Sequence, residues 1–228
     1  MTTLSSLYMQ KRHNLLLDLY QSLEKSLGPA HWWPAKTPFE VCIGAILTQN
    51  APWAGVRKAI AGLQEKGIFT VEGIAEADER MLADAVRPAI YHNQKARRIK
   101  TFCRFLRDEC NGVVEEMRNW ELLAARGKLL SLSGIGYETA DSMLLYALGM
   151  PVFVVDAYTK RILTRHSLIG EECDYEEMRA FFEDALDPDP VLFNEFHALL
   201  CLAGAKYCRK KPLCDQCPAR EILGEPVL

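Results

Sequence analysis

The strongest constraint on the fold is how little of the sequence has the pattern of a β-strand. Apolar residues recur at helical spacing along most of the chain, and helix caps and terminators separate the runs. Helices are predicted over 15–27, 37–49, 52–67, 94–110, 119–130, 137–148, 157–166, 174–186 and 189–205. Only 152–155 has strand-like composition, and four residues cannot form a sheet alone. We interpret this segment as a buried extended connector and expect an all-α fold.

Two helix starts carry specific signals. Thr37, Pro38 and Glu40 have the spacing of a capping box with proline at the first helical position. Asn93 is placed to cap the helix predicted over 94–110.

Length and composition limit the class of protein. The 228 residues can bury one large core or two modest helical lobes. No apolar run approaches the ~20 residues of a membrane span, and 1–11 lacks the apolar core of a secretory signal. We therefore expect an intracellular, cytoplasmic monomer without a membrane partner, associated with the nucleoid if the source is prokaryotic. A net charge of −3 excludes a surface that is basic throughout, so binding to a polyanion would need a local basic patch.

The central motif is the segment 130–137, LSLSGIGY, which joins two predicted helices through a turn with two glycines. Glycines at alternate positions allow positive φ and bring successive N–H groups to one side. The dipole of the following helix adds to these donors, so Gly134, Ile135 and Gly136 form a candidate site for a phosphate oxygen. The alternative is an ordinary connection between two helices.

The segment after this hairpin carries a resemblance to a known family. The hairpin, a helix and then 151–156, PVFVVD, resemble the helix–hairpin–helix plus Gly-Pro-Asp signature of the endonuclease III superfamily of DNA glycosylases. In that family the loop ends on a catalytic aspartate, which would be Asp156 here. A carboxylate near the anomeric carbon stabilises the oxocarbenium character that develops on the sugar. Asp156 also suits a plain helix N-cap before Ala157, and the two roles are compatible.

Members of the family with lyase activity carry a lysine in the second hairpin helix, which attacks the sugar as a Schiff-base nucleophile. Glu138 stands at that position here, and a carboxylate cannot form an imine. The resemblance therefore implies a monofunctional glycosylase with Asp156 and Glu138 at the catalytic positions. Two alternatives remain: a bifunctional glycosylase/lyase that uses another amine, and a non-enzymatic DNA-binding protein with a metal cluster.

Three tryptophans near predicted helix ends, Trp32, Trp33 and Trp53, can line a slot that stacks on an extruded base, or can simply fill the core. A second resemblance, to the 3-methyladenine DNA glycosylase III branch, rests on Trp32-Trp33-Pro34, on 47–50 (LTQN), on 91–96 (YHNQKA) and on Glu138. It implies Trp32 or Trp33 with Trp53 as the stacking pair, although a phenylalanine is expected where Trp53 stands. It also implies an alkylated purine as the substrate, with uracil, mismatched thymine and oxidised pyrimidine as alternatives.

Other residues match positions that contact double-stranded DNA in the family. Gln49 corresponds to the glutamine that fills the gap left by the flipped nucleotide, and the alternative is a solvent-exposed glutamine at a helix end. Ile90, Tyr91 and His92 occupy the loop that inserts a wedge into the base stack.

A basic stripe follows the wedge loop. Arg97, Lys100, Arg104 and Arg107 share one face of a predicted helix. Arg97 and Lys100, nearest the loop, are candidates for phosphate contacts, and a solvated basic face is the alternative.

The eight cysteines fall into two groups. Cys42, Cys103, Cys110 and Cys173 scatter through helical patterns, which predicts core filling. Cys201, Cys208, Cys214 and Cys217 crowd together with C-x6-C-x5-C-x2-C spacing and offer enough thiolates to close a tetrahedral site.

The resemblance implies a [4Fe–4S] cluster, which we favour over zinc, in a structural role. The family's loop is usually spaced C-x6-C-x2-C-x5-C, so the last two gaps are exchanged here. A second alignment makes Cys208 the first ligand. The fourth is then missing after Cys217, and Cys201 must replace it. The alkylpurine branch can also lack the cluster.

The resemblance covers the chain from Trp32 to Cys217 and implies two helical lobes that grip DNA. One lobe would span 37–155 and contain the hairpin, at about 120–148. The other would combine 1–36 with 156–228 and hold the cluster loop, 201–217.

Overall fold

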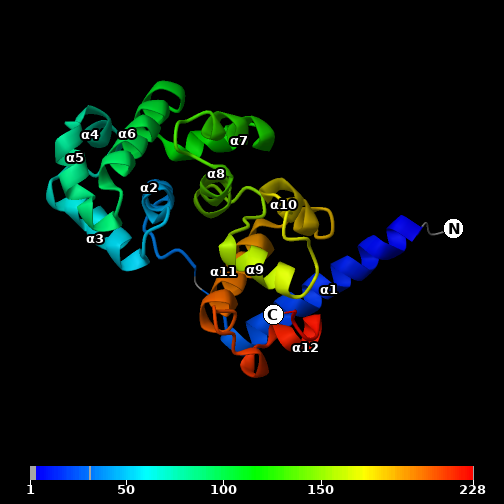
Figure 1. Cartoon of the computed structure of the whole chain (residues 1–228). Coiled ribbons are helices and arrows are strands. Elements are labelled where there is room, and N and C mark those ends of the chain that lie inside the picture. Colours follow the sequence, from blue (N-terminus) through cyan, green and yellow to red (C-terminus); the bar gives the residue numbers. More distant parts are fainter. Residues whose placement is uncertain (1–3, 31, 228) are drawn as a thin grey trace. The chain divides into compact units, whose positions relative to one another are not determined.

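A computed structural model of the chain describes residues 4–30 and 32–227. These residues form helices joined by short loops, with no strand among them, and the predicted all-α class is confirmed (Figure 1). The chain divides into two compact units. Unit 1 comprises the described residues up to Pro34 and from Pro151 onward, and unit 2 runs from Ala35 to Met150. No described helix has the length and apolar character needed to cross a membrane.

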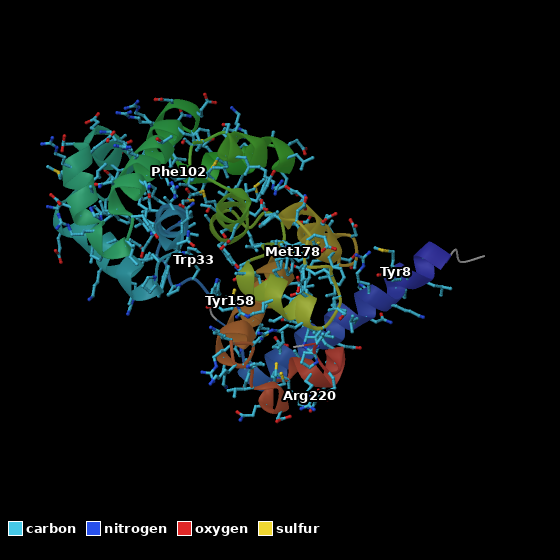
Figure 2. All side chains as sticks on the ribbon, viewed as in Figure 1. Tyr8, Trp33, Phe102, Tyr158, Met178 and Arg220 are labelled. Atoms are coloured by element: carbon cyan, nitrogen blue, oxygen red, sulfur yellow. The ribbon has the colours of Figure 1, made fainter. Side chains whose placement is uncertain are left out.

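Unit 2 carries the hairpin. Its helices are α2 (Pro38–Thr48), α3 (Trp53–Glu65), α4 (Val71–Glu76), α5 (Glu79–Ala85), η1 (Arg87–Ala89), α6 (His92–Glu109), η2 (Val114–Asn119), α7 (Leu122–Leu130), α8 (Tyr137–Ser142) and η3 (Met143–Ala147), a π-helical continuation of α8. The sequence did not predict α4 and α5, since six and seven residues are too few to show a helical period. Both pack against α6, and Phe102 of α6 lies fully buried in the core of this unit (Figure 2).

Unit 1 consists of α1 (Leu4–Leu27), α9 (Ala157–Arg165), α10 (Tyr175–Glu183), α11 (Pro190–Lys206), η4 (Cys214–Gln216) and α12 (Ala219–Leu223). Helix α11 packs against both α1 and α9, and α12 returns onto α1. The first helix ends where predicted but begins well before residue 15.

The connector before Asp156 is buried as predicted. All four of its residues, 152–155, have no exposed surface, and none belongs to a strand. The Phe153 ring stacks on Phe182 with centroids 3.9 Å apart, and the backbone N–H of Phe153 donates to Glu183 at 2.7 Å. Burial and these contacts hold the backbone at Phe153, three residues before Asp156. They therefore restrict the position of the Asp156 carboxylate.

Of the two helix starts with specific sequence signals, one has the predicted cap and the other does not. Thr37 Oγ1 accepts from the Glu40 N–H at 3.1 Å, and Pro38 opens α2. The return bond of the capping box is displaced by one residue, because the Glu40 carboxylate accepts from the N–H of Lys36 at 3.3 Å. Asn93 does not cap α6, because that helix begins at His92, one residue before it.

Three of the four scattered cysteines fill the core, as the sequence predicted, and Cys173 does not. Cys42, Cys103 and Cys110 are buried and Cys173 is half-buried. Burial is the main cause that raises the pKa of the Cys42 and Cys103 thiols, so both stay protonated and behave as small apolar side chains.

A buried ion pair joins the two helices of the hairpin. Arg126 of α7 donates to Asp141 of α8 through Nε at 2.6 Å and Nη2 at 3.0 Å. The side chains are 9% and 0% exposed. A bidentate pair out of water fixes both the distance and the orientation of the helices that flank the turn. No sequence pattern predicted this ion pair.

Candidate active site and nucleic-acid interface

The hairpin turn, residues 131–136, presents the start of α8 to solvent. Gly134 has a φ of +86°, which a residue with a side chain rarely adopts. Gly136 is extended, with a φ of −97° and a ψ of 180°, so only the first glycine has the expected positive φ. The Ile135 N–H donates to Leu132 O at 3.0 Å, and its side chain is buried. Ile135 therefore anchors the turn, while exposed Gly136 leaves the approach to α8 open.

Gln49 connects α2 to this turn. Its Nε2 donates to Gly134 O at 3.0 Å and to Thr139 Oγ1 at 2.9 Å, and its Oε1 accepts from Arg98 Nη1. The alternative of a solvated glutamine at a helix end does not describe this residue. The Arg98 side chain also covers Gly134, where an added Cβ would meet Cδ at 2.7 Å. Sequence reasoning missed Arg98 and Thr139 as partners, because only the fold brings them to Gln49.

The predicted wedge loop has an unusual backbone. Ile90 has a φ of +55° and Tyr91 a φ of +49°, both on the left-handed side that glycine favours. Such conformations cost of order 1–3 kcal/mol each and cluster at functional sites. The two side chains are 46% and 60% exposed, whereas His92 is half-buried in the first turn of α6. The loop thus presents two large apolar side chains to solvent on a backbone that the surrounding structure must hold.

Lys95 helps to stabilise the backbone of this loop. Its side chain is 1% exposed, and Nζ donates to Leu47 O at 2.8 Å and to Ala89 O. Burial, and secondly the charge of Arg98, lower the pKa of Lys95 to about 8. One ammonium group therefore joins the end of α2 to the residue before Ile90. No sequence pattern indicated that this lysine is buried.

The basic stripe on α6 needs a correction. Lys100 is buried, and its Nζ donates to the backbone oxygen of Ala77, the C-cap of α4. Its long side chain reaches a helix C-terminus inside the unit, so it does not face a phosphate. Arg97 is exposed, with Nε 3.3 Å from Glu79 Oε2, and Arg104 is also exposed. The exposed stripe therefore passes from Arg97 to Arg104 without Lys100.

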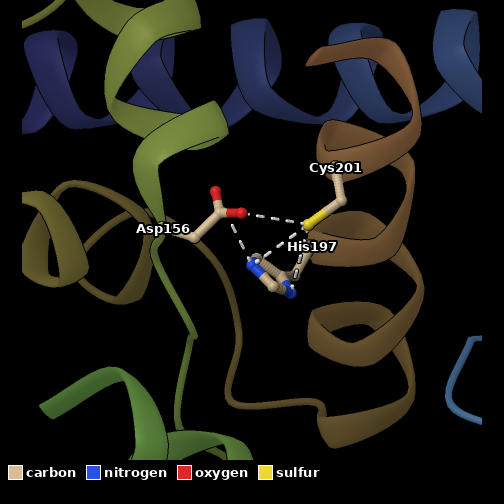
Figure 3. A group of neighbouring side chains, drawn as sticks. All are labelled: Asp156, His197 and Cys201. Atoms are coloured by element: carbon tan, nitrogen blue, oxygen red, sulfur yellow. Dashed lines mark hydrogen bonds and ion pairs between the residues drawn. The ribbon is translucent and has the colours of Figure 1, made fainter. Parts of the chain in front are cut away.

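Asp156 caps α9 and faces α11 (Figure 3). Its Oδ1 accepts from the Thr159 N–H at 2.7 Å and from Thr159 Oγ1 at 2.9 Å, which confirms the predicted cap. Its Oδ2 accepts from Cys201 Sγ at 3.4 Å, and His197 Nε2 lies 3.9 Å from Oδ1. The side chain is only 12% exposed. These contacts fix the orientation of a carboxylate that is largely removed from water.

His197 and Cys201 lie one turn apart on α11, with Cys201 Sγ 3.5 Å from His197 Nε2. Burial lowers the pKa of His197, and Asp156 raises it less. An uncharged imidazole does not neutralise the Asp156 carboxylate. Among the described residues, these three form the one group of His, Cys or acidic side chains whose ligand atoms all lie within 4.8 Å. The sequence did not single out His197.

Cys201, the first of the four cysteines predicted to bind a metal, forms a hydrogen bond with Asp156. Cys208, Cys214 and Cys217 line one cavity of about 20 Å³, and Cys201 does not. Burial is the main cause that raises the pKa of Cys217, and the sulfurs of Cys208 and Cys214 raise it further. Cys201 lies earlier on α11 and faces Asp156.

The remaining candidates are distributed over both units. Trp32 and Trp33 belong to unit 1, and Trp53 opens α3 in unit 2; all three are half-buried. Trp33 has a φ of +63°, and the Trp32 indole Nε1 is shielded from solvent without a hydrogen-bond partner among the described residues. Glu138 is exposed in the first turn of α8, where an acid suits the helix dipole.

A helical hairpin with a glycine turn, followed by a buried connector that ends on a capping aspartate, is the architecture of a helix–hairpin–helix DNA repair protein. Residues 43–188 match the model of the HhH-GPD superfamily base excision DNA repair proteins. The chain belongs to this superfamily and is a DNA glycosylase of base excision repair.

Three known proteins illustrate the relationship. A protein of Methanocaldococcus jannaschii, named provisionally as a DNA repair glycosylase, is 42% identical over 93% of this chain and 97% of its own length. The structure of H. pylori 3-methyladenine DNA glycosylase bound to 1,N6-ethenoadenine has a TM-score of 0.69 and 29% identity, covering 83% of this chain and 95% of that one. A trapped endonuclease III–DNA covalent intermediate has a TM-score of 0.80 at 24% identity, covering 92% and 94%, and shows the shared fold.

Proposed function

We propose that this glycosylase is monofunctional and hydrolyses the N-glycosidic bond of an alkylated purine in double-stranded DNA, acting as a monomer. The observation that carries the proposal is the setting of Asp156, a shielded carboxylate held by Thr159 and faced by His197 and Cys201. Glu138 at the hairpin position offers no amine for a lyase step. The H. pylori relative bound to a modified purine supports the substrate class.

In the proposed reaction, Asp156 stabilises positive charge on the sugar as the bond to the base breaks. Because Thr159 occupies Oδ1 with two hydrogen bonds, the carboxylate keeps one orientation throughout. The bonding electron pair leaves with the base. If the purine is cationic from alkylation, it departs neutral and needs no proton. Water then bonds to the anomeric carbon and gives its proton to solvent or to the carboxylate.

We propose a separate DNA contact for the start of α8, for the wedge loop, for Gln49 and for Arg97. The open start of α8, beyond Gly134 and Gly136, binds a backbone phosphate. Ile90 and Tyr91 enter the base stack, since they are large, apolar and already exposed. Gln49, beside the turn, remains the candidate for the orphaned partner base, and Arg97 for a flanking phosphate.

We further propose that Trp32 or Trp33, together with Trp53, stacks on the extruded base. An aromatic face attracts a cationic base by about 0.5–2 kcal/mol for each well-placed contact. A shielded indole N–H, as on Trp32, is also a hydrogen-bond donor suited to a base edge.

We also propose that the C-terminal cysteines hold a [4Fe–4S] cluster, as the sequence resemblance to the endonuclease III superfamily implies. Two sulfurs on one zinc ion, each about 2.3 Å from the metal, lie within ~4 Å of each other. Cys208, Cys214 and Cys217 line one cavity, yet their sulfurs do not all lie within 4.8 Å of one another. This wider spacing favours a cluster over a single ion. A bound cluster would cross-link α11 to the C-terminal segment.

The test of monofunctionality is borohydride trapping on duplex DNA with the preferred lesion. The wild-type chain should release the base, leave the abasic strand intact and give no covalent adduct. Glu138→Lys places an amine at the hairpin position and should create a trappable adduct, whereas Glu138→Gln, the matched control, should not. An adduct with the wild-type chain would show that another amine acts as a nucleophile.

A further inference from the structure

The cavity at the C-terminal cysteines has a fourth potential ligand that is not a cysteine. Besides Cys208, Cys214 and Cys217, its lining includes Arg165 and His166 from the end of α9. Arg165 Nη1 donates to Cys208 Sγ at 3.2 Å and to Arg209 O at 2.9 Å. These hydrogen bonds connect the end of α9 to the cysteine loop. They also hold His166, the C-cap of α9, near that loop.

The His166 ring has the hydrogen-bonding pattern of a metal ligand. Its Nδ1 is shielded from solvent and has no hydrogen-bond partner among the described residues. Burial lowers the pKa of His166, while backbone hydrogen bonds at Leu223 and Gly224 raise it less. The shielded Nδ1 can therefore present its lone pair to a metal ion. In histidines that bind metals, the other ring nitrogen is commonly hydrogen-bonded to a carbonyl or carboxylate.

The position of His166 explains the departure from the family's cysteine spacing. Counting a C-x5-C gap onward from Cys217 reaches Leu223, where this chain has no cysteine. Leu223 is one of the two residues whose backbone bonds the His166 ring. The imidazole therefore lies next to the place where the spacing would put the fourth thiolate. Cys201, the other candidate, faces Asp156 instead.

We propose that His166 Nδ1 supplies the fourth ligand of the C-terminal metal centre, together with Cys208, Cys214 and Cys217. The identity of the metal in this proposal rests on the proposed [4Fe–4S] cluster. The assignment of His166 as a ligand does not depend on the cluster. A neutral imidazole in place of a thiolate leaves the centre with one negative charge fewer. Lower negative charge and the Arg165 hydrogen bond to Cys208 both favour the reduced state, which raises the reduction potential.

The test uses the full chain purified without oxygen, with iron, sulfide and zinc measured per chain. His166→Ala should lose most of its iron, whereas Cys201→Ala, the matched control, should keep the wild-type content. His166→Cys should restore the cluster and lower its reduction potential. In the reduced wild-type protein, electron–nuclear double resonance should detect a ¹⁴N coupling that His166→Cys removes. Circular dichroism shows whether each variant folds.

The outcomes separate the ligand from the metal. Full iron content in folded His166→Ala, or iron loss in Cys201→Ala, would overturn the assignment of His166. Zinc bound with the same dependence on His166 would support the ligand and contradict the cluster. A wild-type chain that binds neither metal would overturn the ligand proposal. Base release by that chain would still leave the glycosylase proposal standing.

Discussion

Asp156→Asn lowers the single-turnover rate of base release by about 10²- to 10⁴-fold, the range expected for loss of a charged catalytic group. The amide has nearly the shape of the carboxylate, and its oxygen can still accept from the Thr159 N–H, so the cap of α9 survives. The substitution removes the negative charge beside the positive charge that develops on the sugar. The variant should therefore fold and bind DNA while failing in chemistry.

A matched control separates charge from capping. Asp174 caps α10 in the same way, with its side chain accepting from the Glu177 N–H at 2.9 Å. Asp174→Asn should leave the rate of base release within about twofold, since it removes an exposed charge at a helix start. If Asp156→Asn behaves like this control in both rate and affinity, the chain is a DNA-binding protein without the proposed chemistry.

Removing one partner of the buried hairpin pair has the second large effect. Arg126→Met or Asp141→Asn should lower the free energy of unfolding by about 3–5 kcal/mol, because either change breaks a buried, bidentate charge pair. The double variant Arg126→Met/Asp141→Leu should be far less destabilised than the sum of the two, since neither charge remains.

Urea unfolding curves measure these differences. The control is the pair of Lys128 and Glu109, joined at 2.7 Å but 46% and 48% exposed. Glu109→Gln should cost no more than about 1 kcal/mol, as exposed pairs do. Single variants of Arg126 and Asp141 that cost as little as Glu109→Gln would show that the pair does not hold the hairpin together.

Local sequence patterns predicted most of the helices and the position of Asp156. Long helices such as α6 and α11 repeat their apolar residues over several turns, and Asp156 follows a short apolar run at a recognisable distance from the hairpin. The short helices α4 and α5 carry no such repeat and were missed. Helical periodicity also placed Lys100 on an outward face, but it does not report that a flexible side chain bends inward to a carbonyl.

The surroundings of the site could not be read from the sequence, because they are made by contacts between distant segments. His197 and Cys201 reach Asp156 from α11, and Arg98 and Thr139 reach Gln49 from two other helices. Each of these residue types occurs in many unrelated roles, so spacing alone did not indicate that Cys201 contacts Asp156. Only the packing of the helices distinguishes the alternatives.

The most direct test of the central claim is single-turnover base release from duplexes containing 3-methyladenine, 7-methylguanine, uracil, thymine glycol or a G·T mismatch. Each reaction is analysed with and without alkali treatment. We expect release of the methylated purines, with strand breaks only after alkali. Release of thymine glycol with breaks before alkali would contradict both the alkylpurine substrate and the monofunctional mechanism.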